Sequence, residues 1–554
     1  MSARAANRRI RLLVAVFAAV FLAAFVRIGW LQAVKAHALD KLATSQQRVE
    51  MTLPAHRGTI YDRLGVELAI GERAVTVYAN PKEIREPNLV AQAAAQDLGV
   101  DADELLPLLS DRSRGFVYVQ RQADPERAAA LERRGIVGLG FYAEEKRQYP
   151  QRGVAAEVVG YAGVDNRGLA GLELRLERVL RGHDGTKTIV KDPFGRTLEV
   201  LDSEARRDGR DVWLTIDHTI QGQVERVLRD TRKQWEAKAA SAVVMDPRNG
   251  DVLALAVEPG FDANRFPKVP RENQRNRAIT DTYEPGSTFK IVTVSGALES
   301  GIVSPSTSFT LPYSLQVADR VIHDAVERGT QTMTVAQILS QSSNVGIITL
   351  AFQLQQTRLS EWIGRFGFGR RTGIDFPGET EGIVLPPDRW SGSTIGNVPI
   401  GQGIAVTPVQ MAAAYSVIAN GGTWIQPHLV DRIEGGKVAA PKRRRVISTQ
   451  TARDLRHMLR DVVEEGSGTA AQVPGYRIAG KTGTAAKPDE TGGYSDYRYV
   501  ASFVGFVPAA KPRLVILVTV DEPRGAIWGG TVAAPAFAEI AKFALQYLEI
   551  PPRD

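Results

Sequence analysis

The segment Leu12–Val34 constrains this chain most, because it is long and apolar enough to cross a membrane as one helix. Its 23 residues span roughly 30 Å at about 1.5 Å per residue, and Arg27 inside it needs a polar partner or a route to the interface. The basic residues before the segment are Arg4, Arg8, Arg9 and Arg11. They place the N-terminus in the cytoplasm and the chain after about residue 35 outside. We predict a single-pass protein of the cell (inner) membrane, with a cytoplasmic tail over 1–11 and an anchor over 12–34.

A cleaved signal peptide is the alternative interpretation of this segment. Ala36-His37-Ala38 offers a weak A-x-A cleavage site. The apolar run is long for the core of a signal peptide, which favours an uncleaved anchor. No other stretch of the sequence is long and apolar enough to span a membrane.

Composition excludes several classes of chemistry. The chain has no cysteine, so disulfides, thiolate catalysis and Cys-ligated metals are absent. Its seven histidines form no metal-ligand spacing, so we expect no catalytic zinc. Lys and Arg exceed Asp and Glu by 69 − 62 = 7, but these charges are scattered and not clustered with aromatic residues. We therefore expect no nucleic-acid partner; the mild basic excess suits anionic lipid or an anionic polymer.

The length of 554 residues predicts two or three folded units. Up to about residue 235 the chain shows short elements separated by frequent turn signals, and a helix is expected over Ile216–Trp235, opened by Asp217. Further on, Ser241–Asp246 and Asp251–Ala256 indicate a hairpin, and a second apolar strand pair lies near the C-terminus. Helical patterns lie between the pairs. This order predicts an α+β fold, a mostly antiparallel sheet covered by helices.

The first chemical motif is Ser287-Thr288-Phe289-Lys290, at the start of a predicted helix. Positions i and i+3 of a helix share one face, so the Lys290 amine can take the proton of the Ser287 hydroxyl. Apolar residues after Lys290 would bury this helix, and desolvation lowers the pKa of a lysine as a general base requires. Taken alone, a four-residue pattern of this kind arises often by chance.

The second motif is Ser342-Ser343-Asn344. A hydroxyl beside Lys290 can relay a proton to a leaving amine, and the Asn344 amide can position the lysine or a substrate carbonyl. Ser and Asn are also common helix N-caps. Both interpretations stay open, since a helix cap would also fix the position of the motif's side chains.

The third motif is Lys481-Thr482-Gly483-Thr484. On a strand, Gly483 permits close approach of a ligand, and Lys481 with the two threonine hydroxyls can bind a carboxylate. Gly475 also completes the pattern of a phosphate-binding P-loop. The bulky residues between Gly475 and Gly480 and the lack of a following helix disfavour that alternative.

The order S-x-x-K, S-x-N, K-T-G is far more specific than any one motif, and it is the motif set of penicillin-binding proteins and class A β-lactamases. Ser343 stands where the set has Asp, which leans away from the β-lactamases. With these motifs the chain resembles a class B penicillin-binding protein of the FtsI-like type. Two upstream segments, His56–Arg63 and Gly168–Glu173, resemble family motifs of a non-catalytic pedestal, and no segment resembles a glycosyltransferase domain.

The resemblance implies a pedestal (dimerisation-like) domain over 35–236 and a penicillin-binding/β-lactamase-like transpeptidase domain over 237–554. It implies a DD-transpeptidase that cross-links peptidoglycan stem peptides ending in D-Ala-D-Ala through an acyl-enzyme on Ser287, outside the cell. Lys290, Ser342, Asn344 and Lys481 would complete the catalytic network. Thr482, Gly483 and Thr484 would bind substrate, and the backbone N–H groups of Ser287 and Thr484 would form the oxyanion hole.

The resemblance further implies inhibition by β-lactam antibiotics, no metal or organic cofactor, and a SEDS glycosyltransferase (FtsW- or RodA-like) among other cell-wall synthesis proteins as partners. The run Glu284-Pro285-Gly286-Ser287-Thr288 favours a role in septal synthesis during division over one in elongation. A β-lactam hydrolase or sensor, and a non-catalytic scaffold, remain as alternatives. Rapid nitrocefin turnover would indicate the hydrolase.

Overall fold

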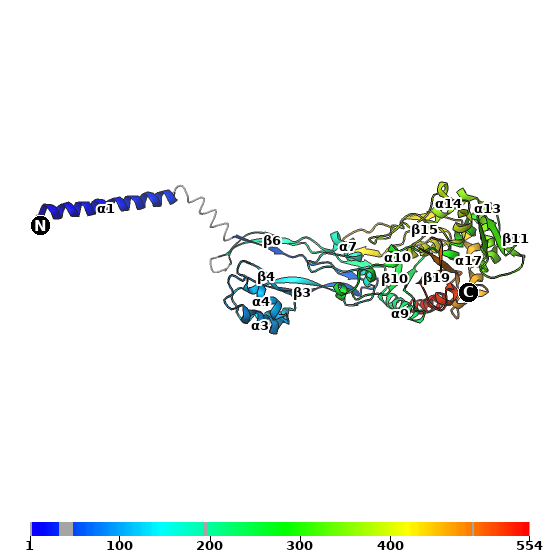
Figure 1. Ribbon diagram of the computed structural model, residues 1–554, viewed down its shortest axis with the longest axis horizontal. Helices are drawn as coiled ribbons and strands as arrows, with labels where there is room; N and C mark the ends of the chain where they lie inside the picture. The colour runs from blue at the N-terminus through cyan, green and yellow to red at the C-terminus, as the bar shows by residue number, and fades with distance from the viewer. Residues whose placement is uncertain (1–2, 33–47, 192–196, 490–491, 553–554) are drawn as a thin grey trace. The chain divides into compact units, whose positions relative to one another are not determined.

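The computed structural model describes residues 3–32, 48–191, 197–489 and 492–552 (Figure 1). It forms two compact units. Unit 1 comprises Met1–His56 and Gly182–Gly209, and unit 2 comprises Arg57–Arg181 and Arg210–Asp554. Each unit is therefore built from two stretches of chain that are not consecutive in the sequence.

Unit 1 contains the apolar helix and a small antiparallel sheet. Helix α1 spans Ala3–Trp30, and its part from Asn7 to Trp30 is long and apolar enough to cross a membrane, with a mean hydropathy of 2.5. The last two residues of the predicted anchor and the weak cleavage site lie outside the described residues. The sheet has the order β1-β6-β7. Its strands are β1 (Arg48–Leu53), β6 (Gly185–Lys191) and β7 (Thr197–Glu204).

The first sheet of unit 2 has the strand order β16-β8-β2-β3-β4, and β5 pairs with β3. Helices α3, α4 and α5 pack against β3 and β4 around a separate apolar core. The strands are β2 (Ile60–Tyr61), β3 (Glu67–Ala79), β4 (Val117–Ala123), β5 (Leu139–Gln148), β8 (Val212–Leu214) and β16 (Val430–Ile433). The helices of this region are α3 (Pro87–Leu98), α4 (Ala102–Ser110), α5 (Pro125–Glu132), α6 (Ala156–Val159), α7 (Gly171–Arg175) and α8 (Glu177–Leu180).

A buried ion-pair network joins the two upstream segments that resemble the family's pedestal. Arg57 Nε lies 2.6 Å from Glu173 Oε2, and Arg147 Nε lies 2.6 Å from Glu173 Oε1. Arg57 also reaches Glu177 Oε2 at 2.7 Å. Although burial opposes its ionisation, the two guanidiniums hold the pKa of Glu173 below its usual value. Arg57, Arg147 and Glu173 are buried from solvent, whereas Glu177 is partly exposed, so the three buried charges depend on one another.

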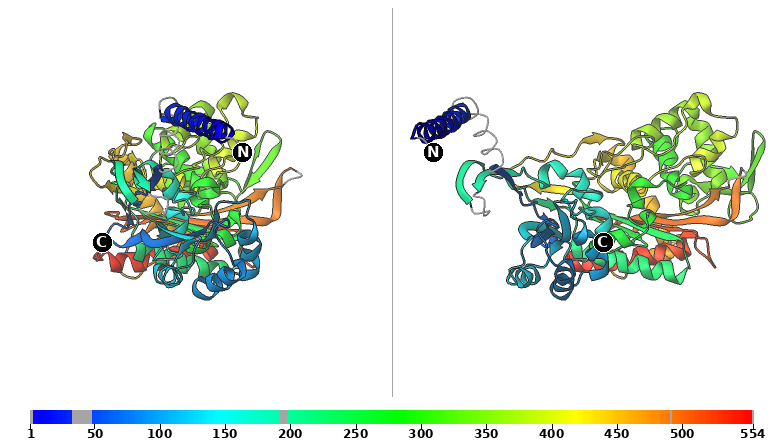
Figure 2. Two further views of the ribbon diagram at one scale, coloured as in Figure 1. Left: turned by 90° about the vertical axis from the view of Figure 1, so that its left-hand side faces the viewer. Right: turned by 60° about the vertical axis from the view of Figure 1, so that its left-hand side comes forward.

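The second sheet of unit 2 is a five-stranded antiparallel sheet with the order β10-β9-β20-β19-β18. Side chains alternate between its faces: Val244 and Ile516 belong to the core under helices α9 and α19, whereas Val243 and Leu517 belong to the core on the other face. Figures 1 and 2 show α9 and α19 side by side against this sheet. The bounds are β9 (Ala239–Met245), β10 (Val252–Glu258), β18 (Ala479–Pro488), β19 (Tyr494–Val507), β20 (Leu514–Asp521), α9 (His218–Gln234) and α19 (Ala534–Tyr547).

Helices cover the opposite face of the five-stranded sheet, which confirms the predicted α+β sandwich. Helix α9 begins after Asp217, whose side chain accepts from two backbone N–H groups as the sequence predicts. The remaining helices of unit 2, on either face, are α10 (Arg277–Thr280), α11 (Lys290–Glu299), α12 (Val335–Ser340), α13 (Asn344–Leu354), α14 (Gln356–Phe366), α15 (Thr394–Asn397), α16 (Pro408–Ala419), α17 (Thr449–Glu464) and α18 (Gly529–Val532). Three strand pairs lie among them: β11 (Ser308–Leu311) with β14 (Gln331–Thr334), β12 (Ser314–Val317) with β13 (Arg320–His323), and β15 (Thr423–Ile425) with β17 (Arg443–Arg445).

Candidate active site

Ser287 lies in a short 3₁₀ turn, η4 (Gly286–Phe289), that leads into the buried helix α11. Gly286 has φ +53°, and a side chain there would meet the Thr484 carbonyl oxygen at 2.9 Å, so the turn packs directly against β18. Ser287 is half-buried, and its hydroxyl forms no hydrogen bond to any residue that the structure describes. The hydroxyl is thus held at a rigid helix start and remains available to a ligand.

The Lys290 side chain is fully buried and points to the S-x-N motif. Its Nζ donates to the carbonyl oxygen of Ser342 at 2.6 Å, to Asn344 Oδ1 at 2.7 Å and to Ser342 Oγ at 3.2 Å. The structure therefore brings together the first two motifs. It contains no direct Ser287–Lys290 hydrogen bond; such catalytic contacts often tighten only when substrate is bound.

The S-x-N motif joins α12 to α13, and its three residues have separate tasks. Ser342 adopts a left-handed backbone conformation with φ +60°, a strained choice for a serine. Ser343 is the N-cap of α13 and accepts from Gly346 N–H at 3.0 Å. Capping and positioning therefore occur together, as two of the three residues face Lys290 while the middle one begins the helix.

Asp324 is a buried residue that the sequence patterns did not indicate. Its carboxylate accepts from Ser343 Oγ at 3.0 Å and from Val345 N–H at 3.1 Å, and Arg328 Nε donates to it at 3.0 Å. It thereby anchors the middle residue of the S-x-N motif from a segment that lies between β13 and β14. No local periodicity or motif marks Asp324, and only the tertiary fold brings it to α13.

The K-T-G motif lies inside strand β18. Lys481 Nζ donates to Ser342 Oγ at 2.9 Å, which joins the third motif to the second. Thr484 Oγ1 accepts from Gly529 N–H at 3.0 Å, and Thr482 Oγ1 lies 2.7 Å from Ser467 Oγ. A strand at this position does not form the loop and helix of a P-loop, so the phosphate-binding alternative is wrong.

Gly483 is required by the packing of the protein itself. A Cβ atom at this position would lie 2.4 Å from Ser502 Oγ, 2.9 Å from the Pro285 carbonyl oxygen and 2.9 Å from Thr288 Cγ2. Strand β18 and the turn that carries Ser287 are therefore in contact through a residue without a side chain. This contact fixes the distance between the turn of Ser287 and the strand edge.

The buried lysines have depressed pKa values, which suits proton transfer near neutral pH. Burial lowers the pKa of Lys481 to about 7. Burial, and then the neighbouring Lys481, lower the pKa of Lys290 well below its usual value, although Asp324 acts in the opposite direction. Amines in such surroundings are available in their unprotonated, basic form.

One group among the described residues offers three potential metal ligands, Asp62, Asp217 and His218, whose ligand atoms lie within 4.8 Å of one another. These atoms already serve the fold. Asp62 Oδ2 lies 2.6 Å from His218 Nδ1, and Asp217 caps helix α9. The three motifs themselves supply lysine, serine, threonine and asparagine, a donor set without a metal-binding character.

Comparisons with known proteins agree with this geometry. The penicillin binding protein transpeptidase domain family matches residues 240–542, and the penicillin-binding protein dimerisation domain family matches residues 52–214. The chain is 33% identical over 557 aligned residues to the probable peptidoglycan D,D-transpeptidase PenA of Neisseria meningitidis, covering 99% of this chain and 94% of that protein. It is 32% identical to the peptidoglycan D,D-transpeptidase FtsI of Escherichia coli, covering 95% of this chain and 89% of that protein.

Among solved structures, penicillin binding protein 3 of Mycobacterium tuberculosis in complex with aztreonam superposes with a TM-score of 0.73 at 32% identity. The alignment covers 91% of this chain and 98% of that one. The chain therefore belongs to the penicillin-binding proteins. Within them it is a class B enzyme, a serine-type peptidoglycan D,D-transpeptidase of the FtsI-like type, and its N-terminal helix is long and apolar enough to serve as a membrane anchor.

Proposed function

We propose that Ser287 is the nucleophile and that Lys290, Ser342, Asn344 and Lys481 are its catalytic network. The observation that carries this proposal is the convergence of two buried amines, Lys290 and Lys481, on the single hydroxyl of Ser342. A serine hydroxyl needs a base to react at neutral pH, and these amines have the lowered pKa values that such a base requires.

In the acylation step, Ser287 Oγ attacks the carbonyl carbon of the penultimate D-Ala and Lys290 accepts the hydroxyl proton. The new C–O bond gives a tetrahedral oxyanion, which the backbone N–H groups of Ser287 and Thr484 stabilise. When the C–N bond breaks, Ser342 and Lys481 relay the proton held by Lys290 to the leaving amine of the terminal D-Ala, which returns Lys290 to its basic form. The stem peptide remains as an ester on Ser287.

In the second step, the amine of a neighbouring stem peptide attacks the ester carbonyl. Its proton returns through Lys290 to Ser287 Oγ, and an amide cross-link replaces the ester. Thr482, Gly483 and Thr484 hold the substrate along β18, with the threonine hydroxyls directed to the terminal carboxylate. This chemistry uses no metal or organic cofactor.

We further propose that the enzyme acts in septal cell-wall synthesis during division and that β-lactams inhibit it by acylating Ser287. Its similarity to FtsI and the Glu284–Thr288 sequence support this role. The domains are a cytoplasmic tail over 1–11, an anchor over 12–34, a pedestal over 35–236 and a transpeptidase over 237–554, with the catalytic part outside the cell. A SEDS glycosyltransferase would polymerise the glycan that this enzyme cross-links.

Mass spectrometry after exposure to a labelled penicillin tests the nucleophile. We expect one adduct, on the peptide that contains Ser287, and none in Ser287→Ala. An adduct on another residue, or cells in which the Ser287→Ala protein still supports cross-linking, would overturn the mechanism.

A further inference from the structure

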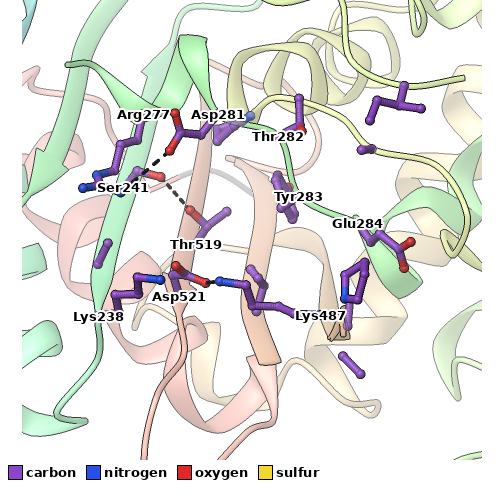
Figure 3. Close-up of a pocket in the computed structure, with 18 of the residues that line it drawn as sticks. Lys238, Ser241, Arg277, Asp281, Thr282, Tyr283, Glu284, Lys487, Thr519 and Asp521 are labelled. Atoms are coloured by element: carbon purple, nitrogen blue, oxygen red, sulfur yellow. Dashed lines mark hydrogen bonds and ion pairs between the residues drawn. The ribbon is translucent and has the colours of Figure 1, made fainter. Parts of the chain in front are cut away.

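A cavity begins next to the three motifs, and their proposed roles do not explain it. It has a volume of about 580 Å³ and lies over the β9, β20, β19 and β18 strands of the five-stranded sheet (Figure 3). Its lining includes Ala485, which follows Thr484 on β18, and Glu284, which precedes Ser287 by three residues. The volume is typical of sites that bind small ligands or peptide side chains.

The positive charges that line this cavity are all paired. Lys487 Nζ lies 2.8 Å from Asp521 Oδ1, and Arg275 Nη2 lies 2.9 Å from Asp281 Oδ2. Lys487 points toward Asp521, and Arg277 toward Asp281, in Figure 3. The remaining three pairs are Lys487 with Glu522 at 2.6 Å, Arg277 with Asp281 at 3.7 Å and Lys238 with Glu522 at 3.3 Å.

Glu284 is the exception among the carboxylates of the lining. Its Oε1 accepts from Gly403 N–H at 3.1 Å and from the Tyr494 hydroxyl at 3.2 Å. Its Oε2 is buried and has no hydrogen-bond partner, and no cation lies within 4.0 Å of the carboxylate, among the residues that the structure describes. The hydroxyl of Tyr283, which also lines the cavity, is likewise buried without a partner.

A half-satisfied carboxylate at a cavity wall favours a ligand that brings both hydrogen-bond donors and positive charge. Burial raises the pKa of Glu284, and an approaching cation would favour its ionised form. A primary ammonium has three donors on one centre, and its bonds to a carboxylate are among the strong ones. An anionic ligand would instead meet an unpaired carboxylate.

We propose that this cavity is a subsite that holds a primary ammonium group of a stem-peptide substrate against Glu284. The inference rests on the proposed transpeptidase function and deepens it. The ammonium has two sources: the side chain of the donor stem, which acylates Ser287, or that of the acceptor stem, which resolves the acyl-enzyme. Glu284 is a positioning and specificity residue in either case, and the lysines retain the proton transfers.

The donor test compares two peptides that end in D-Ala-D-Ala, with a lysine before these residues whose ε-amine is free or acetylated. In the wild-type protein we expect the free amine to raise kcat/KM for D-Ala release about tenfold, the effect of one charge-assisted contact. Glu284→Gln, which keeps the acceptor oxygen for Gly403 and Tyr494, should lose this preference. Asp281→Asn removes a paired carboxylate from the same cavity and should keep it.

The acceptor test adds a peptide with a free side-chain amine but no D-Ala-D-Ala, and measures the ratio of cross-linked to hydrolysed product. If the subsite serves the acceptor, Glu284→Gln should lower this ratio about tenfold while D-Ala release is unchanged. A loss in the donor test, in the acceptor test or in both supports the proposal and identifies the source of the amine.

Acylation of Ser287 by benzylpenicillin, which has no amine, separates the two levels of the hypothesis. Suppose that benzylpenicillin acylates wild type and Glu284→Gln equally fast, and that both proteins show the same amine preference in both tests. This result would overturn the proposed subsite and leave the proposed transpeptidase function intact. A wild-type enzyme with no amine preference in either test overturns it even if the variant fails to fold. A protein that is not acylated at Ser287 overturns the proposed function and the subsite together.

Discussion

Lys290 and Lys481 donate to one and the same oxygen, for Ser342 Oγ lies 3.2 Å from Lys290 Nζ and 2.9 Å from Lys481 Nζ. Two ammonium groups at such a separation repel each other in a buried site, so the arrangement favours loss of a proton from the pair. Among the described residues, the Ser342 hydroxyl is also the only group that is hydrogen-bonded to both amines. This position between the two amines suits Ser342 to the proton transfer that we propose.

Replacing Ser342 by Ala should lower the rate constant for acylation by benzylpenicillin about 100-fold or more, because the proton path between the lysines is interrupted. Stopped-flow measurement with a fluorescent penicillin checks this. Ser343→Ala is the matched control: it removes the cap of α13 and should cost about 1 kcal/mol of stability while retaining most of the rate. Equal rates for Ser342→Ala and wild type would contradict the relay.

The pH dependence of acylation should follow the buried lysines. Because the proposed base, Lys290, acts unprotonated, and burial holds its pKa well below the usual value, the rate constant should rise with pH as this lysine loses its proton and then level off. Acylation by benzylpenicillin between pH 5 and 9 gives this profile, since its carboxylate stays ionised throughout that range. A rate that falls between pH 6 and 8 would be incompatible with a lysine base.

Gly483→Ala should reduce both stability and acylation. The new methyl group would collide with Ser502 Oγ and with the Pro285 carbonyl oxygen, at 2.4 and 2.9 Å, and would separate β18 from the turn of Ser287. We expect a loss of about 1–3 kcal/mol in the free energy of unfolding, measured by chemical denaturation. Gly115→Ala, with no atom within 4 Å of the added group, is the control and should change neither property.

Glu173→Gln should destabilise the protein by about 3–5 kcal/mol, because it leaves Arg57 and Arg147 buried without their shared counter-charge. Thermal unfolding reports this loss. The exposed pair of Arg226 and Glu539 is the control, and Glu539→Gln should cost under about 1 kcal/mol. If both variants lose the same stability, the buried network does not contribute as proposed.

Local features of the fold were predictable because their causes are local. Asp217 before an amphipathic run predicts the start of α9, and the turn at Asn249-Gly250 between two apolar runs predicts the hairpin of β9 and β10. The three motifs were recognisable from residue type and order. The P-loop alternative arose from the same kind of reasoning, and it failed because a short pattern does not specify whether it lies on a strand or in a loop.

Other features depend on contacts between distant segments, and no sequence pattern indicates them. Arg57 and Glu173 are separated by 116 positions, and the sequence around each residue does not indicate which residue it will pair with. Asp324 reaches Ser343 only after β12 and β13 have folded back toward α13. Whether Glu284 Oε2 has a hydrogen-bond partner depends on the residues that surround it in the fold, so the sequence alone could not predict that it has none.

The sheet of unit 1 has a consequence for how such a chain matures. Strand β1 follows the apolar helix, yet its neighbour β6 lies far along the chain, where Arg48 pairs with Val190. In synthesis from the N-terminus, β1 is made first and keeps an unpaired edge until β6 has also been synthesised. Long-range pairing of this kind is slow, and an open edge invites wrong partners. The pairing of β1 with β6 would therefore be the step of folding most exposed to chaperones and proteases.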